Sequence, residues 1–337
     1  MRGRLMKVSK NIKFFINYFL GPVLFVWLAW SVYRQIMAQP DLGKAWQHVR
    51  QSFNSPLIWN LVIVVLLMFV NWAIEAVKWK ISVKEVQEVN FAKAFMAVLS
   101  GVSFAVSTPN RVGEYLGRVL YMKEGNRLKT ISITITGSIS QLIITLFIGC
   151  IGLYVLRPAI IEQHLISSLW MQVIFYGVLA TAIVLTVFYF RLSWLVKWIE
   201  KIPGSRRFVY LVEAIEHFDA TLLIRLLSLS LLRFIVFIIQ YYLLFDLFGV
   251  NMGWWQTFWT VSVSFLVMAI IPTISLLELV QRGNVVAAIV GLYSANIVGM
   301  SFATASIWFI NLVIPAIAGS LLILRMRKII SEKNEEV

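Results

Sequence analysis

The sequence predicts an all-α polytopic membrane protein with six full transmembrane helices and two proline-broken re-entrant hairpins, arranged as an inverted-topology repeat. Three observations lead to this prediction: the apolar composition, two long apolar segments that contain proline, and the uneven distribution of basic residues. Apolar residues make up 60% of the 337 residues and charged residues only 14%. A soluble domain of this length would not show such a balance.

Six segments are long and apolar enough to cross a bilayer, which requires about twenty apolar residues. The first begins after a short basic stretch and lacks a small-residue cleavage site, so we expect it to be retained as a helix. The stretch 191–220 mixes basic and apolar residues and predicts an interfacial helix between two halves of the chain, with 34–55 as a short external counterpart. The expected spans are residues 15–33, 56–77, 130–156, 169–190, 222–247 and 301–324.

Two further apolar segments, residues 91–122 and 254–298, are interrupted by Pro109 and Pro272. Proline removes a backbone hydrogen-bond donor, and the backbone groups that it frees at membrane depth must face protein or water instead of lipid. We therefore expect each segment to be a re-entrant hairpin with its proline near the middle of the membrane.

The basic residues indicate the orientation of the spans. Lysines and arginines are concentrated in the N-terminal arm, in the loops 78–93, 123–129 and 191–207, and in the C-terminal tail, whereas the opposite side carries only Arg34, Lys44, Arg50 and Arg157. Positively charged loops remain in the cytoplasm, so we expect both termini there and both broken segments to return to the side they entered. Residues 1–160 and 165–337 are then two membrane repeats of opposite orientation within one integral membrane domain.

Both broken segments resume with the same spacing of charges. Glu114 and Arg118 follow the first proline, and Glu278 and Arg282 follow the second, so each segment carries an i, i+4 pair of opposite charge. Charged side chains at membrane depth are expensive and usually mark a functional site. The alternative is that each pair merely neutralises itself so that it can be buried.

The first of these helix starts has the features of an anion site. Arg111, Glu114 and Arg118 fall at i, i+3 and i+7 and therefore share one helical face, which carries a net positive charge. Unpaired backbone N–H groups and the helix dipole favour an anion at the same point. Because arginine matches phosphate oxygens bidentately, we expect these residues, with Glu278 and Arg282 from the other side, to bind the phosphate of a lipid headgroup.

Several other polar residues lie within the expected spans. We add Arg233 and Glu75 to the headgroup site, because Arg233 is far from a loop and Glu75 could orient an arginine or couple a proton. Lys78 is expected to anchor its span at the interface, and Arg225 to extend to the membrane surface in the same way. The hydroxyl-rich stretch 132–141 is expected to serve helix packing, with a polar cavity wall as the alternative.

Other kinds of site find no support in the sequence. Cys150 is the single cysteine, and His48, His164 and His217 are far apart, so no disulfide framework, zinc site or haem motif is expected. We expect no catalytic residue, no metal and no cofactor. The formal charge of +14 could suggest nucleic acid, but the basic residues lie in short loops between spans. Membrane topology and anionic lipid headgroups account for them better.

The residues Pro109 to Glu114 read Pro-Asn-Arg-Val-Gly-Glu. This run resembles the Pro-Gly-Arg-x-Gly-Glu signature of the lysylphosphatidylglycerol synthetase transmembrane-region family, the flippase-like membrane domains, with Asn110 in place of a glycine. The resemblance extends to Lys78-Trp79, to the segment from Pro272 to Glu278 and to Pro315. It implies movement of phospholipid or glycolipid headgroups between leaflets, with two re-entrant hairpins around a central lipid cavity. The soluble aminoacyl-transferase domain of bifunctional members is not expected in this chain.

These observations favour a flippase-like protein of a bacterial-type inner (plasma) membrane, which translocates an anionic phospholipid or glycolipid without covalent chemistry. Its partners are then membrane lipids, with a homodimer and a separate lipid-modifying enzyme left open, and nucleic acid is not expected. One alternative is a membrane-embedded transferase that acts on a lipid-linked substrate, which would need paired acidic residues as a metal site or general base. Another is a non-transporting accessory subunit, for which the charges at membrane depth would be dispensable.

Overall fold

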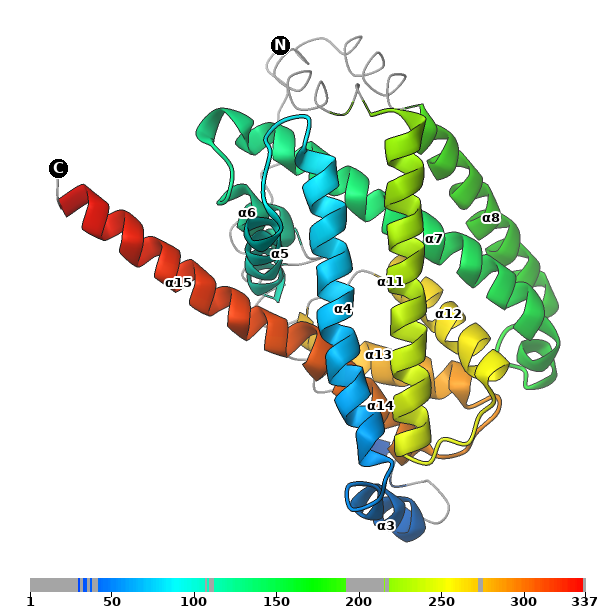
Figure 1. Cartoon of the computed structure of the whole chain (residues 1–337). Coiled ribbons are helices and arrows are strands. Elements are labelled where there is room, and N and C mark those ends of the chain that lie inside the picture. Colours follow the sequence, from blue (N-terminus) through cyan, green and yellow to red (C-terminus); the bar gives the residue numbers. More distant parts are fainter. Residues whose placement is uncertain are drawn as a thin grey trace, which may run out of the picture.

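The computed structural model of this chain describes residues 42–106, 108, 112–191, 218–271 and 275–335, and the single positions 30, 33, 34, 37 and 215. These residues form helices joined by short connections (Figure 1). Apart from the single positions, the expected span 15–33 and most of the expected interfacial helix 191–220 lie outside the described residues. So do Pro109, Arg111 and Pro272.

Among the described residues, five helical stretches are long and apolar enough to cross a membrane. Each overlaps one predicted span, so the chain is a multi-pass α-helical membrane protein, while the span at 15–33 stays a prediction. Four of them are α4 (Ile58–Val83), α7 (Arg127–Glu162) with the preceding turn Glu124–Asn126, α8 (Ser168–Phe190) and α11 (Ala220–Leu247). The fifth, Ile297–Arg325, consists of α14 (Ile297–Trp308), the π-helical turn Phe309–Val313 and the first part of α15 (Ile314–Glu335).

The predicted interruptions of the two broken segments are confirmed. Helix α5 (Phe91–Val106) ends before the first proline and α6 (Gly113–Val119) begins after it. Helix α12 (Trp254–Ile270) and α13 (Ser275–Val290) flank the second proline in the same way. Helices α5 and α12 are apolar, but they are shorter than the five candidate spans. In each half of the chain, a long helix is therefore followed by a broken segment and then by another long helix.

Helices α4 and α11 lie side by side and antiparallel at the centre of the molecule (Figure 1). Near the start of α4, Asn60 Nδ2 donates a hydrogen bond to Asp246 Oδ2 at the end of α11 over 2.8 Å. Near the other end of α4, Lys78 Nζ donates to Ser230 Oγ in the first half of α11 over 3.3 Å. The long helix that precedes each broken segment thus meets its counterpart in the opposite direction.

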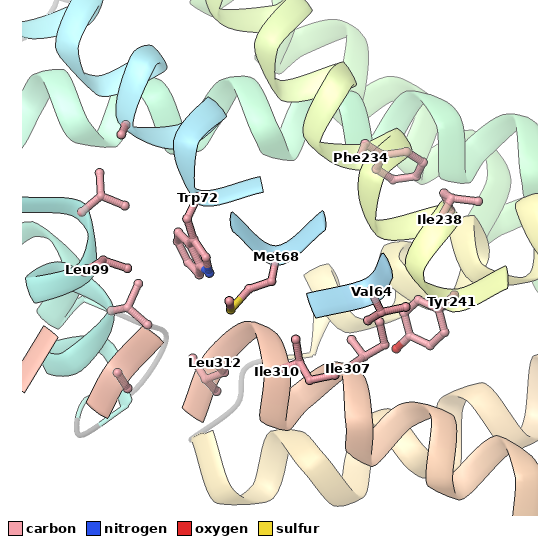
Figure 2. Packing of buried hydrophobic residues seen from close by; sticks show 14 of the residues in the cluster. Val64, Met68, Trp72, Leu99, Phe234, Ile238, Tyr241, Ile307, Ile310 and Leu312 are labelled. Atoms are coloured by element: carbon pink, nitrogen blue, oxygen red, sulfur yellow. The ribbon is translucent and has the colours of Figure 1, made fainter. Parts of the chain in front are cut away.

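The apolar core surrounds this central pair of helices. Figure 2 shows Val64, Met68 and Trp72 on successive turns of α4, where the i, i+4, i+8 spacing keeps them on one face. They pack among side chains of α11 and of the last helical stretch, which include Phe234, Ile238, Tyr241, Ile307, Ile310 and Leu312. Because lipid tails are as apolar as these side chains, close van der Waals packing stabilises such a core in a membrane.

Each broken segment packs against the last long helix of the other half. Helix α5 lies on α15, where a Cβ at Gly319 would collide with the carbonyl oxygen of Leu99. Helix α12 lies on α7, where a Cβ at Gly149 would come within 2.6 Å of the Leu266 side chain. Small residues allow both pairs of helices to approach closely. The two halves therefore exchange equivalent contacts.

Helices α3 (Leu42–Ser52) and α8 lie at the periphery (Figure 1). Helix α3 falls within the stretch 34–55 that was expected to form a short external element, and its Trp46 ring contacts Phe302 of α14. Helix α8 packs on α7, and large apolar side chains such as Leu169 and Tyr176 are exposed along it. An apolar exposed surface of this kind suits contact with lipid.

Candidate functional site

One buried carboxylate brings three cationic side chains together. Glu75 of α4 is 4% exposed, and its Oε1 accepts a hydrogen bond from Arg118 Nη2 over 2.9 Å. Its Oε2 lies 2.9 Å from Lys78 Nζ and also pairs with Arg233 Nη1. Arg118 pairs in addition with Glu114, one turn earlier on α6. We refer to these five residues, Glu75, Lys78, Glu114, Arg118 and Arg233, as the Glu75 cluster.

Helix geometry explains how α4, α6 and α11 supply this cluster. On α4, Asn71, Glu75 and Lys78 fall at i, i+4 and i+7 and therefore share one face. Helix α6 reaches that face because it packs tightly on α5, which itself packs on α4. A Cβ at Gly117 of α6 would come within 2.5 Å of the Gly101 backbone in α5. Small residues between α5 and α6 thus determine where the α6 arginine lies.

The Glu75 cluster carries an excess of positive charge. Among the described residues, its three cations face two carboxylates, which leaves one positive charge uncompensated. The side chains of Glu75, Lys78 and Arg118 are at most 5% exposed, whereas Arg233 is 11% and Glu114 20% exposed. A buried charge without a counter-ion is costly. The arrangement therefore favours an anion on the more open side, beside Glu114 and Arg233.

Three buried N–H donors beside the cluster have no acceptor among the described residues. They are Asn71 Nδ2, Trp72 Nε1 and Arg118 Nε. Asn71 is fully buried, with its Oδ1 accepting from Arg233 Nε over 2.7 Å, and the Arg233 guanidinium lies 5.4 Å from the Trp72 ring centroid. An unpaired buried donor costs about 1–3 kcal/mol. A ligand with several acceptor oxygens would satisfy these donors and the excess charge together.

Lys78 belongs to the cluster, and its predicted role as an interfacial anchor is wrong. Helix α4 continues to Val83, so Lys78 lies inside the helix, 2% exposed. In addition to Glu75, its ammonium group donates to the Gly137 carbonyl oxygen over 3.2 Å and to Ser230 Oγ over 3.3 Å. These three acceptors match the three donors of a lysine ammonium group. The i, i+3 spacing from Glu75 was the sequence signal for this role.

The hydroxyl-rich part of α7 has two roles. Most of its hydroxyl groups donate to the carbonyl oxygen one turn earlier, as Thr134 does to Thr130 over 2.8 Å, which agrees with a helix-packing role. Ser140 also donates within its own helix, to the Gly137 carbonyl oxygen over 2.7 Å, and in addition it extends the polar network of the cluster. Its Oγ lies 2.8 Å from Ser230 Oγ, the hydroxyl group that accepts from Lys78. Part of this stretch thus supports the Glu75 cluster.

The second pair, Glu278 and Arg282, lies on α13. Arg282 Nη2 donates to Glu278 Oε1 over 2.6 Å. The side chain of Arg282 is 15% exposed and that of Glu278 is 7% exposed. The Arg282 guanidinium lies over the Phe265 ring of α12, 6.0 Å from its centroid. The structure therefore brings three predicted site residues, Glu114, Arg118 and Arg233, together with Glu75. It places the Glu278–Arg282 pair on a different helix and does not describe Arg111.

A family model described as lysylphosphatidylglycerol synthase TM region matches residues 18–319. The chain belongs to this family. The match includes both halves of the chain and all five candidate spans up to residue 319, and it confirms the family resemblance predicted from the sequence. No curated protein matches the chain.

In this member of the lysylphosphatidylglycerol synthase TM-region family, the motif around Gly113 has a clear structural reason. The Gly113 N–H donates to Thr108 Oγ1 over 2.7 Å at the start of α6. A Cβ at Gly113 would collide with the Phe104 carbonyl oxygen at the end of α5. The glycine therefore lets α6 turn back closely onto α5, and Glu114 and Arg118 then reach Glu75.

Proposed function

We propose that this protein translocates an anionic phospholipid or glycolipid between membrane leaflets, and that the Glu75 cluster binds the phosphate of the headgroup. One observation carries this proposal: a buried cluster with excess positive charge is surrounded by three N–H donors that lack an acceptor among the described residues. Phosphate offers both the negative charge and several acceptor oxygens. Arginine is the side chain best suited to bind it through two parallel hydrogen bonds.

The position of the cluster supports a transport role. It is formed where the broken segment α5–α6 meets α4 and α11, the two central antiparallel helices. In transporters built from repeats, ligands bind at broken helices near the interface between the repeats. The partly exposed Glu114 and Arg233 provide an entrance, while the more deeply buried Glu75 holds the cationic side chains in place.

We infer that residues 1–160 and 165–337 form an inverted repeat of six spans and two re-entrant hairpins, with both termini in the cytoplasm of a bacterial-type inner membrane. The reciprocal packing of α5 on α15 and α12 on α7 supports this inference, as does the antiparallel α4–α11 pair. Cysteines at exposed positions test it in a Cys150→Ala background. Glu124→Cys should label from inside, and His164→Cys and Asn251→Cys from outside. Labelling of position 124 from outside would make the first hairpin a full span.

We propose translocation without covalent chemistry. Glu75, Glu114 and Glu278 each pair with at least one cationic side chain, which leaves them poorly placed to act as a general base. A separate enzyme would then produce or modify the lipid. A transferase acting on a lipid-linked substrate predicts release of a modified lipid, and an accessory subunit predicts that loss of Arg233 leaves lipid movement unchanged.

Lipid exchange in proteoliposomes tests the proposed function directly. A fluorescent phosphatidylglycerol is reconstituted with the protein, and dithionite bleaching reports how fast inner-leaflet lipid reaches the outer leaflet. Arg233→Gln should slow exchange by about tenfold or more, because the phosphate loses a charge-assisted partner. Arg225→Gln is a matched control, since Arg225 is exposed on the same helix. Equal exchange by both variants and the unmodified protein, with equal expression, would refute the proposal.

A further inference from the structure

A group of aromatic side chains occupies the region between the Glu75 cluster and the Glu278–Arg282 pair. On α11, Phe237 follows Arg233 by four residues and therefore lies one turn further along the same face. Its ring centroid is 5.9 Å from that of Phe265 on α12, at an interplanar angle of 78°. Phe265 also contacts Arg282, whose guanidinium lies over the ring. Phe237 and Phe265 thus link the two arginines.

Several aromatic rings of α11 pack against Phe265. Besides Phe237, the rings of Phe234 and Tyr241 pack edge-on against it, with centroids at 5.6 Å and 5.8 Å. Phe234 and Tyr241 are buried, whereas Phe237 and Phe265 are half-buried, as are Arg233 and Arg282. The series therefore borders the accessible side of the packed core. Its members are Arg233, Phe237, Phe265 and Arg282.

These rings would oppose the passage of an anion from one arginine to the other. The face of an aromatic ring carries negative potential, which attracts a guanidinium group but repels phosphate. An anion that moved from Arg233 along this face of α11 would meet the Phe237 ring and then the Phe265 ring, whose face is already covered by Arg282. A charged group leaving one site for the other thus requires Phe265 to move.

We propose that Phe265 is the barrier between two successive anion sites, one at the Glu75 cluster and one at Arg282, and that an anionic headgroup passes only when this ring turns away from Arg282. The transfer of a headgroup rests on the proposed function, whereas the barrier between two anion sites does not. Phe265 is a positioning residue in this scheme. Its removal should join the two sites into one path for small anions.

The test measures two fluxes in the same proteoliposomes. Chloride entry is followed with a trapped chloride-sensitive dye, and exchange of fluorescent phosphatidylglycerol with dithionite. Phe265→Ala should raise chloride entry by about tenfold or more over the unmodified protein, because the apolar barrier is gone. Phe175→Ala is the matched control, since Phe175 is a half-buried ring that packs against Tyr154 and Tyr176 away from both arginine sites.

The outcomes separate the two proposals. If the rate of chloride entry through Phe265→Ala is within about twofold of the rate through the unmodified protein, the proposal that Phe265 is a barrier is overturned, even if the unmodified protein moves lipid. Raised chloride entry with no lipid exchange by the unmodified protein would leave the barrier in place and refute lipid transport. If Phe265→Ala does not fold, Phe265→Leu decides. It keeps apolar bulk but loses the ring face, so chloride entry should rise by about threefold, and entry at the unmodified level would overturn the proposal.

Discussion

The Glu114–Arg118 and Glu278–Arg282 pairs share their sequence spacing but differ in their surroundings. Arg118 is 2% exposed and shares a second carboxylate, Glu75, with two further cations. Arg282 is 15% exposed and is paired with one carboxylate over an aromatic ring. The first pair is therefore part of a charged network with positive charge in excess, whereas the second joins one arginine to one carboxylate among the described residues. Equal motifs in the two halves thus give two different electrostatic environments.

The difference indicates how the two halves divide one task. A cluster with excess positive charge and unpaired donors binds an anion tightly, whereas a neutral pair beside a ring binds one weakly. A transported group must enter a favourable site and still be able to leave it. We therefore expect the Glu75 cluster to select the headgroup and the Arg282 side to accept and release it.

The two sites should differ most in how much the loss of their carboxylate destabilises the protein. Glu75→Gln leaves two buried cations and the half-buried Arg233 facing Glu114 alone, so we expect a loss of about 3–5 kcal/mol in the free energy of unfolding. Glu278→Gln leaves one partly exposed arginine and should cost about 1–3 kcal/mol. Thermal unfolding in detergent measures both, with Glu124→Gln as a control because Glu124 is 90% exposed. Equal losses for Glu75→Gln and Glu278→Gln would remove the distinction between the two sites.

The second-largest difference is expected in lipid transport by variants of Arg118 and Arg282. Arg118→Lys keeps the positive charge but loses the guanidinium fork and its Nε donor, so lipid exchange should fall by about tenfold or more. Arg282→Lys should reduce exchange by less than about threefold, because a single ammonium group can still pair with Glu278. Dithionite bleaching of a fluorescent anionic lipid provides the measurement. A greater loss in Arg282→Lys would place the selective site in the second half.

A double-mutant cycle sharpens the interpretation of the second pair. Glu278→Gln and Arg282→Gln should each destabilise the protein, and the double variant should recover about 1–2 kcal/mol, because no buried charge is left alone. Lipid exchange should remain slow in the double variant if Arg282 accepts the headgroup. Unfolding temperature and exchange are therefore scored separately. Recovery of both would show that the pair is only a structural neutralisation.

The smallest expected effect concerns α7. Ser140→Ala removes the hydroxyl group beside Ser230, and should cost about 1 kcal/mol of stability. Ser138→Ala removes a hydroxyl group that donates to the Thr134 carbonyl oxygen on its own helix, and should change stability by less than about 0.5 kcal/mol. Chemical or thermal unfolding compares the two variants. Identical stabilities would mean that the hydroxyl groups of α7 serve helix packing alone.

Local sequence patterns were enough to predict the spans and the charged residues. Apolar length predicted the five helical stretches found among the described residues, and proline predicted the two interruptions. Helical spacing also gave the Glu114–Arg118 and Glu278–Arg282 pairs. These features depend on residues within a few turns of one another, so a single sequence carries them.

Contacts between distant helices could not be predicted in the same way. The burial of Lys78 depends on how far α4 continues and on Gly137 and Ser230, which come from two other helices. The unpaired donors at Asn71 and Trp72 emerge only once their neighbours are in place. The separation of the second pair from the first likewise follows from the packing of α12 and α13, which no local pattern contains.

The central claim is that the Glu75 cluster, and not the Glu278–Arg282 pair, is the selective phosphate site. An electron cryo-microscopy structure of the protein in nanodiscs rich in phosphatidylglycerol tests it most directly. The account predicts phosphate density within hydrogen-bonding distance of Arg118 Nε and Asn71 Nδ2, beside the Arg233 guanidinium. Lipid phosphate at Arg282, with the Arg118 and Asn71 donors bonded to protein or water instead, would contradict it.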